Sequence, residues 1–383
     1  MKLHFTHEEF RGRERRTLAA MARRRLDALF LFSPESQYWL TGYDSFGYCF
    51  FQCLILTADG RKALLTRSAD LRQARLTSRI ADVRVWTDGV DAEPAAALRA
   101  LARELGLAGR RIGVEWASKG LDAASGRALE ASFAEAAELL DASRLVAELR
   151  LVKSPAELAY VRRAARLADD ALDAALEASG PEADEAWIEA ALTGAILAGD
   201  GDASANPPIV GSGAYALLCR SHTGRRRLDA RDQLTLEWAA TYRRYHAAQM
   251  RTICIGEPSP RHLELFDAAE EALAASETRL RPGYTAGEVF EAHAHVLDRR
   301  GLGEHRLNAC GYALGATYAP AWMDWPMLHA ANPVVLEPRM VFFLHMILMD
   351  STTGTAMTLG RSSIVTDGAP EPLSARPVEL LVR

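Results

Sequence analysis

The sequence predicts a protein of two domains that mix helices and strands, which is the α/β class, or α+β in a broader sense. Short apolar strands alternate with helical segments through the first part of the chain. A helix-start signal at Ser154 then opens a region with long helices and one extended hairpin. With 383 residues, of which 49% are hydrophobic, the chain is long enough to bury two cores. We therefore expect a first domain over residues 1–145 and a second over 146–383.

The first domain is predicted to begin with a surface helix over residues 7–25, because Phe10, Leu18 and Met21 recur at helical spacing. A buried strand over 28–32 follows, and Ser33-Pro34 is expected to stop it. The further elements expected are strands at 50–57, 62–66, 83–86 and 111–115 and helices at 91–104 and 121–130. This alternation is typical of a sheet that is covered by helices.

The second domain opens at Ser154-Pro155-Ala156-Glu157, where the serine caps a helix and the glutamate reaches back to the cap. In a later hairpin, residues 234–238 alternate apolar and polar side chains, which predicts a half-buried strand. A break at Ala239-Ala240, a turn over 242–245 and a second strand over 250–255 complete this hairpin. The other elements expected are helices at 185–198, 263–279 and 285–299 and a strand at 208–211.

Composition excludes several classes of partner. A net charge of -5 argues against nucleic acid, and no segment reaches the run of ~18 apolar residues that a membrane span needs. The N-terminus is charged throughout and lacks the apolar centre of a signal peptide. The 5 cysteines are an odd number without CxxC spacing, which favours a reducing compartment. We expect a cytoplasmic protein that has neither a membrane nor a nucleic acid as its partner.

The hairpin around Glu237 resembles the metal-binding hairpin of the pita-bread family, which includes creatinase and the prolidases. In the metallopeptidases of this family, two aspartates of the hairpin bind a pair of divalent metals. Tyr242, Tyr245 and Arg251 fall in register with the family pattern, whereas Glu237 stands at the first aspartate position and Ala248 at the second. The resemblance covers essentially the whole chain. It implies a creatinase-like N-terminal α/β domain followed by a C-terminal pita-bread domain.

The other metal positions of the family are changed as well. Tyr312 stands where the family has its third ligand, a histidine, and His345 stands where it has the fourth, a glutamate. The last glutamate falls at Gly360 or Arg361, and neither is a carboxylate. A pair of divalent ions needs several carboxylates around it, and one carboxylate with one histidine cannot replace them. The resemblance therefore implies a site without a metal and without a cofactor.

Within the family, the sequence is similar to the metal-free hydrolases creatinase and ectoine hydrolase, and the details favour the second. The similarity is carried by Leu40-Thr41-Gly42-Tyr43-Asp44, by Arg244-Tyr245-His246 and by the segment from Tyr318 to Trp322. Creatinase keeps its catalytic glutamate where this chain has Met250. The resemblance implies a hydrolase of carbon–nitrogen bonds other than peptide bonds. Its substrate would be a small amidine or guanidine compound or a cyclic metabolite derived from an amino acid.

Without a metal, a side chain must activate the attacking water. Glu237 is the candidate base, because a glutamate is disfavoured inside a strand and needs a reason to be there. His222 is the candidate proton shuttle, because imidazole titrates near neutral pH. The expected substrate-binding residues are His246, Tyr312, Tyr318, Trp322, Asp324, His345, Asp44, Phe46 and Tyr48. One carboxylate among aromatic faces suits a planar cation.

The aromatic segment from residue 43 to residue 52 has two interpretations. It is either a core strand with its turn, or a lid that reaches across a dimer interface, as in the metal-free relatives. An aromatic-rich loop would otherwise expose an apolar patch that monomers rarely tolerate. We expect a homodimer in which this segment completes the partner's site.

Several alternatives remain open. Glu237 could neutralise Arg251 or Arg244 instead of acting as a base. Cys219 or Cys310 could supply a nucleophile, although a buried, inert thiol is the more common state of such a residue. The chain could also be a non-catalytic pita-bread protein that binds a peptide or a partner, or a hydrolase or lyase for an unrelated small amide. Convergence of the candidate residues in one pocket would favour an enzyme over a binding protein.

Overall fold

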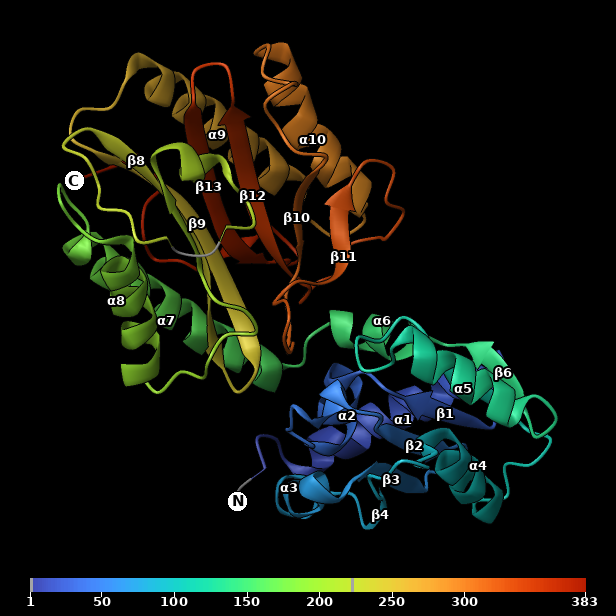
Figure 1. Ribbon diagram of the computed structural model, residues 1–383. Helices are drawn as coiled ribbons and strands as arrows, with labels where there is room; N and C mark the ends of the chain where they lie inside the picture. The colour runs from blue at the N-terminus through green and yellow to red at the C-terminus, as the bar shows by residue number, and fades with distance from the viewer. Residues whose placement is uncertain (1–2, 222–223) are drawn as a thin grey trace. The chain divides into compact units, whose positions relative to one another are not determined.

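The computed structural model describes residues 3–221 and 224–383, and the chain divides into two compact units, Met1–Arg150 and Leu151–Arg383 (Figure 1). This division comes after residue 145, because helix α6 (Leu145–Leu151) continues beyond that position. The α/β fold class predicted from the sequence is confirmed in both units. No helix in the described ranges combines the length and the apolar content that a membrane crossing requires.

The first unit is built on a six-stranded sheet with the strand order β4-β3-β2-β1-β5-β6. The sheet is mixed, because β1 pairs antiparallel with β2 and parallel with β5. Its strands are β1 (Ala28–Leu31), β2 (Cys53–Thr57), β3 (Lys62–Arg67), β4 (Asp82–Trp86), β5 (Arg111–Val114) and β6 (Glu138–Asp141).

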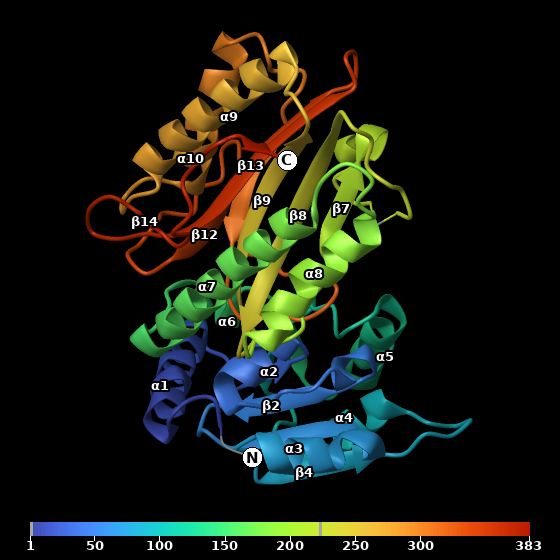
Figure 2. The ribbon, with the colours of Figure 1, turned by 90° about the vertical axis from the view of Figure 1, so that its left-hand side faces the viewer.

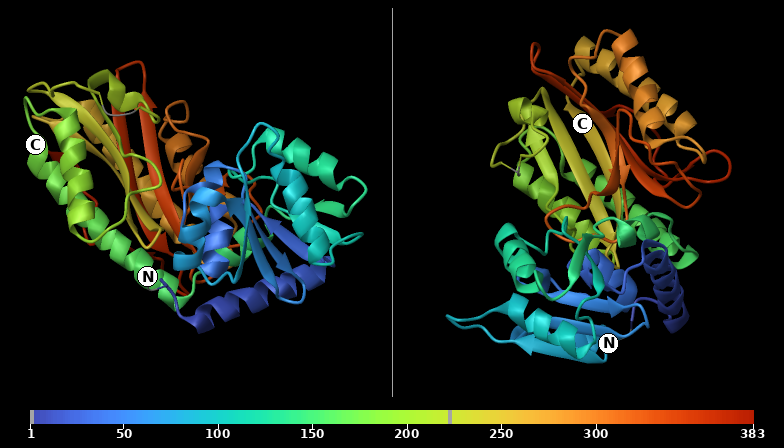
Figure 3. Two further views of the ribbon diagram at one scale, coloured as in Figure 1. Left: turned by 60° about the horizontal axis from the view of Figure 1, so that its bottom comes forward. Right: turned by 90° about the vertical axis from the view of Figure 1, so that its right-hand side faces the viewer.

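Helices cover both faces of this sheet, because its central strands are apolar on both sides. Phe30 and Ile55 pack against α4 and α5, whereas Leu29 and Leu54 pack against the helices of the other face. The ribbon of Figure 3 shows helices on both sides of this sheet. These helices are α1 (His7–Arg24), α2 (Pro34–Thr41), α3 (Leu71–Thr77) and α6 on one face, and α4 (Pro94–Glu104) and α5 (Ala123–Phe133) on the other. Two 3-10 turns, η1 (Gly47–Cys49) and η2 (Ser68–Asp70), complete the unit.

The second unit contains a nine-stranded sheet whose main path is β11-β10-β12-β13-β9-β8-β7, with β14 paired to β13 and β15 paired to β9. The central hairpin consists of β8 (Asp232–Tyr242) and β9 (Tyr245–Ile255). The other strands are β7 (Ile209–Ser212), β10 (Ala309–Ala313), β11 (Asp324–His329), β12 (Val341–Asp350), β13 (Thr355–Ile364), β14 (Glu371–Pro372) and β15 (Leu381–Val382). The 3-10 turn η3 (Gly213–Leu217) follows β7 directly.

Helices pack on one face of this sheet, and the other face carries both polar and apolar side chains. The helices α7 (Pro155–Ala178) and α8 (Glu185–Ala198) lie side by side over β8 and β9 (Figure 2). The helices α9 (Pro260–Arg279) and α10 (Ala286–Arg299) cover β10, β12 and β13. Leu236 on β8 and Leu344 on β12 belong to the cores beneath these helices. Because neighbouring residues of a strand point to opposite faces, Glu237 and His345 lie on the face away from the helices.

The predicted capping box at the start of α7 is confirmed. The Ser154 hydroxyl accepts a hydrogen bond from the Glu157 N–H, and the Glu157 carboxylate accepts one from the Ser154 N–H. A second capping box, formed by Thr285 and Glu288, starts α10. Each cap stabilises its helix by about 1 kcal/mol. Helices that begin at fixed residues also fix the register with which they pack on the sheet.

The predicted break at Ala239-Ala240 is wrong, because β8 continues without interruption to Tyr242. Both alanines are fully buried, so their small size serves close packing on the two faces of the strand. The hairpin turn consists of Arg243 and Arg244 alone, with φ values of 51° and 67°. Left-handed conformations at both positions are typical of a two-residue turn, whose twist matches that of the flanking strands.

Two further predictions about local structure need correction. Ser33-Pro34 ends the first strand as expected, but it also starts α2, because proline suits the first turn of a helix. Phe50 and Phe51 do not belong to a strand, since β2 begins only at Cys53 and η1 precedes them. The aromatic segment from residue 43 to residue 52 is therefore a turn that leads into a strand, with exposed and buried rings side by side.

Candidate active site

The face of the second sheet that is free of helices carries one continuous row of residues across five strands. Ile209 on β7 pairs with Glu237 on β8, and Glu237 pairs with Met250 on β9. Met250 pairs with Gly360 on β13, and Gly360 pairs with His345 on β12. The sheet register therefore aligns two of the predicted site residues, Glu237 and His345, with Met250 and Gly360 between them.

Glu237 is a buried carboxyl group with 6% of its surface exposed. Burial raises the pKa of Glu237 to about 7, because the charged form loses its hydration, while a hydrogen bond from Tyr312 and the positive charge of Arg220 act in the opposite direction. At neutral pH a carboxyl group with this pKa is present in both forms in comparable amounts. It can therefore accept a proton from water and later return it.

Tyr312 and Trp322 form a chain of hydrogen bonds that ends on Glu237. The indole Nε1 of Trp322 donates to the Tyr312 hydroxyl at 2.7 Å, and that hydroxyl donates to Oε1 of Glu237 at 3.2 Å. The backbone N–H of Trp322 donates to Oδ1 of Asn206 at 3.1 Å. Burial, and then the charge of Glu237, hold the pKa of Tyr312 well above its usual value. Tyr312 therefore stays protonated and acts as a hydrogen-bond donor to the carboxyl group.

Three rings lie against one another beside Glu237. The ring centroids of Tyr312 and Phe343 are 5.4 Å apart, and both rings lie 5.6 Å from the imidazole of His345. Burial lowers the pKa of His345 to about 3, so the ring is neutral at physiological pH. Its Nδ1 has no hydrogen-bond partner among the described residues. An unpaired buried nitrogen is free to bind a polar group of a ligand.

Gly360 has no room for a side chain, because Phe343 fills the space beside it. A Cβ atom at Gly360 would lie 2.7 Å from Cζ of Phe343 and 2.9 Å from the backbone oxygen of Leu344. Contacts this short are not tolerated in packed protein interiors. At Gly360, one of the two positions that the resemblance compares with the last carboxylate of the metallopeptidases, the space for a side chain is thus occupied by an aromatic ring from the neighbouring strand.

Ala248, which the resemblance compares with the second aspartate, has no donor atom in its side chain. Ala248 donates its N–H to the Ser362 hydroxyl at 2.9 Å, and that hydroxyl donates to the Ala248 carbonyl at 2.8 Å. Across residues 3–221 and 224–383, no group of three or more His, Cys, Asp or Glu side chains is placed to hold a metal ion. The donor set of this face does not fit the pair of divalent ions that the fold family implies, because such ions need carboxylates from several strands.

His246, expected to bind substrate, has both ring nitrogens in contact with the protein. The Ala205 N–H donates to Nε2 at 3.2 Å, and Nδ1 lies 3.1 Å from the Thr317 hydroxyl. The Thr317 hydroxyl also lies 3.3 Å from the carbonyl oxygen of Trp322. An Nε2 that accepts a backbone hydrogen bond leaves the proton on Nδ1. His246 therefore holds the segment that carries Trp322 in position.

The other expected site residues lie in different places. Tyr318 is buried, with the Arg244 guanidinium 5.2 Å from its ring centroid, and Asp324 stands at the start of β11. His222 lies outside the described residues. Asp44, Phe46 and Tyr48 belong to the first unit, where Phe46 is 77% exposed and Tyr48 is buried.

The structure gives Arg251 partners other than Glu237. Arg251 is paired with Leu236 and lies on the opposite face, where its Nη1 donates to the carbonyls of Met250 and Gly360. Arg244 lies at the hairpin turn. Burial also raises the pKa of the Cys219 and Cys310 thiols, which disfavours the thiolate that a nucleophile requires.

Two residues of the site were not predicted from the sequence. Phe343 precedes His345 by two residues on β12, so the period of a strand places both on one face and could have revealed it. Arg220 lies in the connection after η3, and its charge acts on Glu237, Tyr312 and His345. No periodic pattern marks a single arginine in a connection, so the sequence held no signal for Arg220.

Comparison with known proteins gives matches along almost the whole chain. Residues 159–367 match the metallopeptidase family M24, and residues 13–152 match the creatinase/prolidase N-terminal domain. An uncharacterized hydrolase/peptidase of Sinorhizobium fredii is 28% identical, with 100% of this chain and 99% of the relative covered. The ectoine hydrolase of Halomonas elongata is 25% identical, again with 100% and 99% covered. Among solved structures, the dipeptidase PepE of Mycobacterium ulcerans superimposes with a TM-score of 0.86 at 25% identity, and 99% of each chain is covered.

Proposed function

Because this chain belongs to the metallopeptidase family M24 and carries a creatinase/prolidase N-terminal domain, we propose that it is a hydrolase that cleaves a carbon–nitrogen bond without a metal. The proposed substrate is a small amidine or guanidine compound or a cyclic metabolite derived from an amino acid. The chain is homologous both to an ectoine hydrolase and to prolidases. The choice between an ectoine-hydrolase-like reaction and the cleavage of a peptide bond therefore depends on the residues of the site.

The observation that carries the proposal is the replacement of the metal ligands on the face that holds Glu237. Ala248 offers no donor atom, and Gly360 is covered by the Phe343 ring. A metallopeptidase site places carboxylates at both positions, and neither can be supplied here. Glu237 remains as a buried carboxyl group whose pKa is about 7, a value that suits a general base at neutral pH.

The residues support the following chemistry. The Glu237 carboxylate takes a proton from water, and the water oxygen forms a bond to the carbon of the C–N bond. The electron pair of the cleaved bond goes to nitrogen, which receives a proton from the site. Tyr312 donates to Glu237 and so stabilises the anion that must be present before attack. We assign the delivery of the proton to His222.

The surroundings of Glu237 favour a cationic reacting group. The Tyr312 hydroxyl donates to the carboxylate, and the Tyr312 ring lies 5.4 Å from the ring of Phe343. Aromatic faces attract planar cations such as an amidinium. His345 is neutral and offers the unpaired Nδ1, which could accept a hydrogen bond from an N–H of such a group. A peptide bond carries no charge and would gain less from this environment.

We also propose that the enzyme is a homodimer and that the segment from residue 43 to residue 52 completes the partner's site. Phe46 is 77% exposed and Phe50 is 47% exposed, which leaves two rings of the first unit in water. The Arg67 guanidinium lies 3.8 Å from the centroid of the Phe50 ring, so this side of the segment already carries a cation. Exposed aromatic rings of this kind are enriched at protein interfaces.

A substrate screen with chelator-treated protein tests the proposal. Ectoine, hydroxyectoine, creatine and related guanidino acids are incubated beside a Xaa-Pro dipeptide, with Glu237→Gln as the blank. We expect turnover of a compound of the first group that persists in chelator and is lost in Glu237→Gln. Cleavage of the dipeptide only after addition of Mn²⁺ or Co²⁺ would show a metallopeptidase instead. Tight binding without turnover of any compound would favour the non-catalytic binding protein.

A further inference from the structure

The helix α8, which the structure describes in full, has an exposed face made only of apolar residues and glycine. Its buried side contains Ile188, Leu192 and Ile196, which belong to the core between α7, α8 and the sheet. Its exposed positions are Ala186, Trp187, Ala190, Gly194, Leu197 and Ala198. Trp187 is 74% exposed and Leu197 is 50% exposed. A helix that is apolar all round is normally covered, and exposed apolar stripes mark contacts with another molecule.

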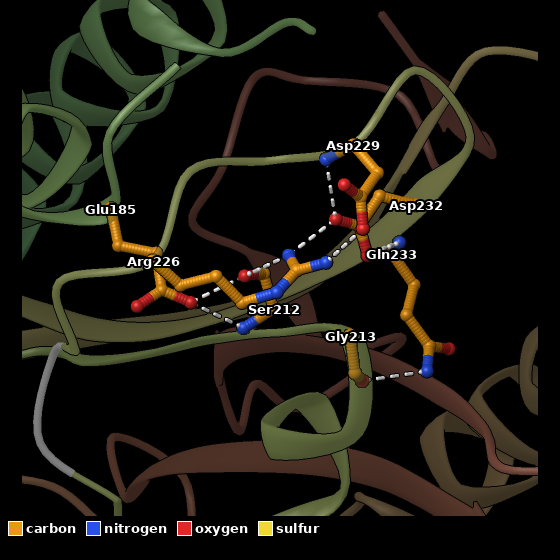
Figure 4. A network of polar contacts seen from close by, with 7 residues as sticks. All are labelled: Glu185, Ser212, Gly213, Arg226, Asp229, Asp232 and Gln233. Atoms are coloured by element: carbon orange, nitrogen blue, oxygen red, sulfur yellow. Dashed lines mark hydrogen bonds and ion pairs between the residues drawn. The ribbon is translucent and has the colours of Figure 1, made fainter. Parts of the chain in front are cut away.

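Polar contacts at both ends hold α8 in place. At its start, Oε1 of the buried Glu185 accepts hydrogen bonds from the Ser212 hydroxyl and, at 2.8 Å, from the Ser212 N–H (Figure 4). The Arg226 guanidinium donates to the same hydroxyl at 2.7 Å. At its end, the Arg163 guanidinium on α7 donates to the Gly199 carbonyl. The apolar face therefore belongs to a helix that is fixed on the second unit, and a partner can dock on it without ordering it first.

The exposed face of α8 is symmetric along the sequence around Leu192. Trp187 and Leu197 stand five residues before and after it, and Ala190 and Gly194 stand two residues before and after it. When two copies of a helix pack antiparallel about a two-fold axis, each position meets the position at the same distance on the other side of the centre. Trp187 of one copy then meets Leu197 of the other at both ends, and the small Ala190 and Gly194 meet where the helices come closest. A Cβ atom at Gly194 would have no described atom within 4 Å, so this centre is open.

The size and the charges of this face decide how strong such a pairing is. The stripe is about 15 Å long and about 10 Å wide, which is far below the ~800 Å² per partner that a stable interface needs. The antiparallel arrangement sets the positive end of each helix dipole beside the negative end of the other. Asp184, Asp200 and the guanidinium of Arg163 come together at each end, so side-chain charge does not drive the contact. The apolar side chains therefore supply the association, and it is weak and reversible.

We propose that α8 is a self-association surface, through which two copies of this chain pair antiparallel about a two-fold axis. The proposal depends neither on the substrate nor on the segment from residue 43 to residue 52. At the concentrations of an activity assay, the homodimer proposed above is the main species. When the protein is concentrated, α8 joins two such species. The contact adds no residue to the face that carries Glu237, so turnover per chain stays the same.

Analytical ultracentrifugation of the full chain from about 1 μM to about 1 mM tests the proposal. We expect the mass of the main species to double as the concentration rises. Trp187→Asp and Leu197→Arg should each raise the Kd of this step by roughly tenfold or more, because each places a charge against an apolar side chain. An equimolar mixture of the two variants should regain part of the association. In the mixed pair, the new carboxylate faces the new guanidinium at one end, and the original side chains meet at the other.

Leu263→Asp is the matched control, because Leu263 is also 50% exposed but lies on α9. It should leave the Kd unchanged. A mass that does not change with concentration, or an unchanged Kd in Trp187→Asp, would overturn the proposal. If both α8 variants lose the association and their mixture does not regain it, the antiparallel pairing is wrong. Binding of the wild type to phosphatidylcholine vesicles that is lost in Trp187→Asp, without self-association, would assign the face to a lipid surface instead.

Discussion

The hydroxyl of Tyr312 accepts a hydrogen bond from Trp322 and donates one to Glu237. Its bond to Glu237 stabilises the anion, and this opposes the effect of burial on the pKa of Glu237. Tyr312, which the resemblance compares with a metal-binding histidine of the family, is thus a direct partner of Glu237.

The variant Tyr312→Phe should therefore raise the pKa of Glu237 further and move the acid limb of kcat/KM to higher pH. It also leaves the buried Nε1 of Trp322 without its acceptor, which should lower the free energy of unfolding by about 1–3 kcal/mol. Rate profiles against pH and denaturant unfolding measure the two effects. Tyr284→Phe is the control, because the Tyr284 hydroxyl only accepts an exposed hydrogen bond from Arg279. An unmoved acid limb in Tyr312→Phe would contradict the prediction.

Glu237→Gln keeps the shape of the side chain and removes the base. We expect turnover to fall by roughly 10² or more, while circular dichroism and the unfolding transition show an intact fold. His222→Ala should also lose turnover, since proton delivery to nitrogen is assigned to this residue. If both variants keep near-normal rates, the pair is misassigned, and Tyr312 and His345 become the next candidates.

The stability of the second unit should fall as the pH rises through the pKa of Glu237. The folded pKa, about 7, lies above the unfolded value of about 4.3, so the fold favours the neutral acid. The stabilisation is complete below the unfolded pKa and is lost as the pH rises through about 7. Glu237→Gln cannot ionise and should be more stable than the wild type at about pH 8, by up to about 3 kcal/mol, and equal to it at about pH 4.

Denaturant or thermal unfolding of both proteins at matched pH measures this difference. The comparison cancels the contributions of other groups that titrate in the same pH range. One such group is Glu115 in the first unit, because burial raises its pKa to about 7. A constant difference between variant and wild type across the range would mean that the fold does not raise the pKa of Glu237.

The purified protein should contain no stoichiometric transition metal, and chelators should leave its activity unchanged. The reason is the donor set at the family's ligand positions, where Ala248 and Gly360 provide no ligand atom. Elemental analysis of the purified protein and assays with and without chelator check this. Two Mn, Co or Zn ions per chain, bound in contact with Glu237, would refute the prediction.

Two variants that are each inactive should restore activity when mixed, if each site uses the partner's segment from residue 43 to residue 52. Phe46→Asp disables the segment, and Glu237→Gln disables the base. In a mixed dimer, one site combines an intact Glu237 with an intact segment from its partner. Light scattering should show a dimer, and activity should return after the two variants are unfolded and refolded together.

Trp187→Asp is the control for this experiment, since Trp187 is also exposed, at 74%, but lies on α8. It should retain activity as a homodimer and need no complementation. A monomer in solution, or a mixture of Phe46→Asp and Glu237→Gln that stays inactive, would exclude a shared site.

The pattern of residue types within short stretches of the sequence was sufficient to predict the fold class, the capping box of α7 and the hairpin that carries Glu237. Each of these depends on residues a few positions apart, such as Ser154 and Glu157. The packing of Phe343 on Gly360 and the contact between Asn206 and Trp322 join residues that are distant in the sequence. Such contacts depend on the register of the sheet and on the course of the connections, which a single sequence does not reveal.

The packing of Phe343 against Gly360 also restricts the evolutionary paths that are open to descendants of this chain. A carboxylate introduced at position 360 first would collide with the ring. A small residue introduced at position 343 first would leave a cavity, at a cost of about 3–5 kcal/mol for Phe→Ala. Each single step is harmful alone, and a metal site would still lack a ligand at Ala248. A pair of metal ligands at positions 248 and 360 thus needs several simultaneous substitutions and is out of reach by single mutations.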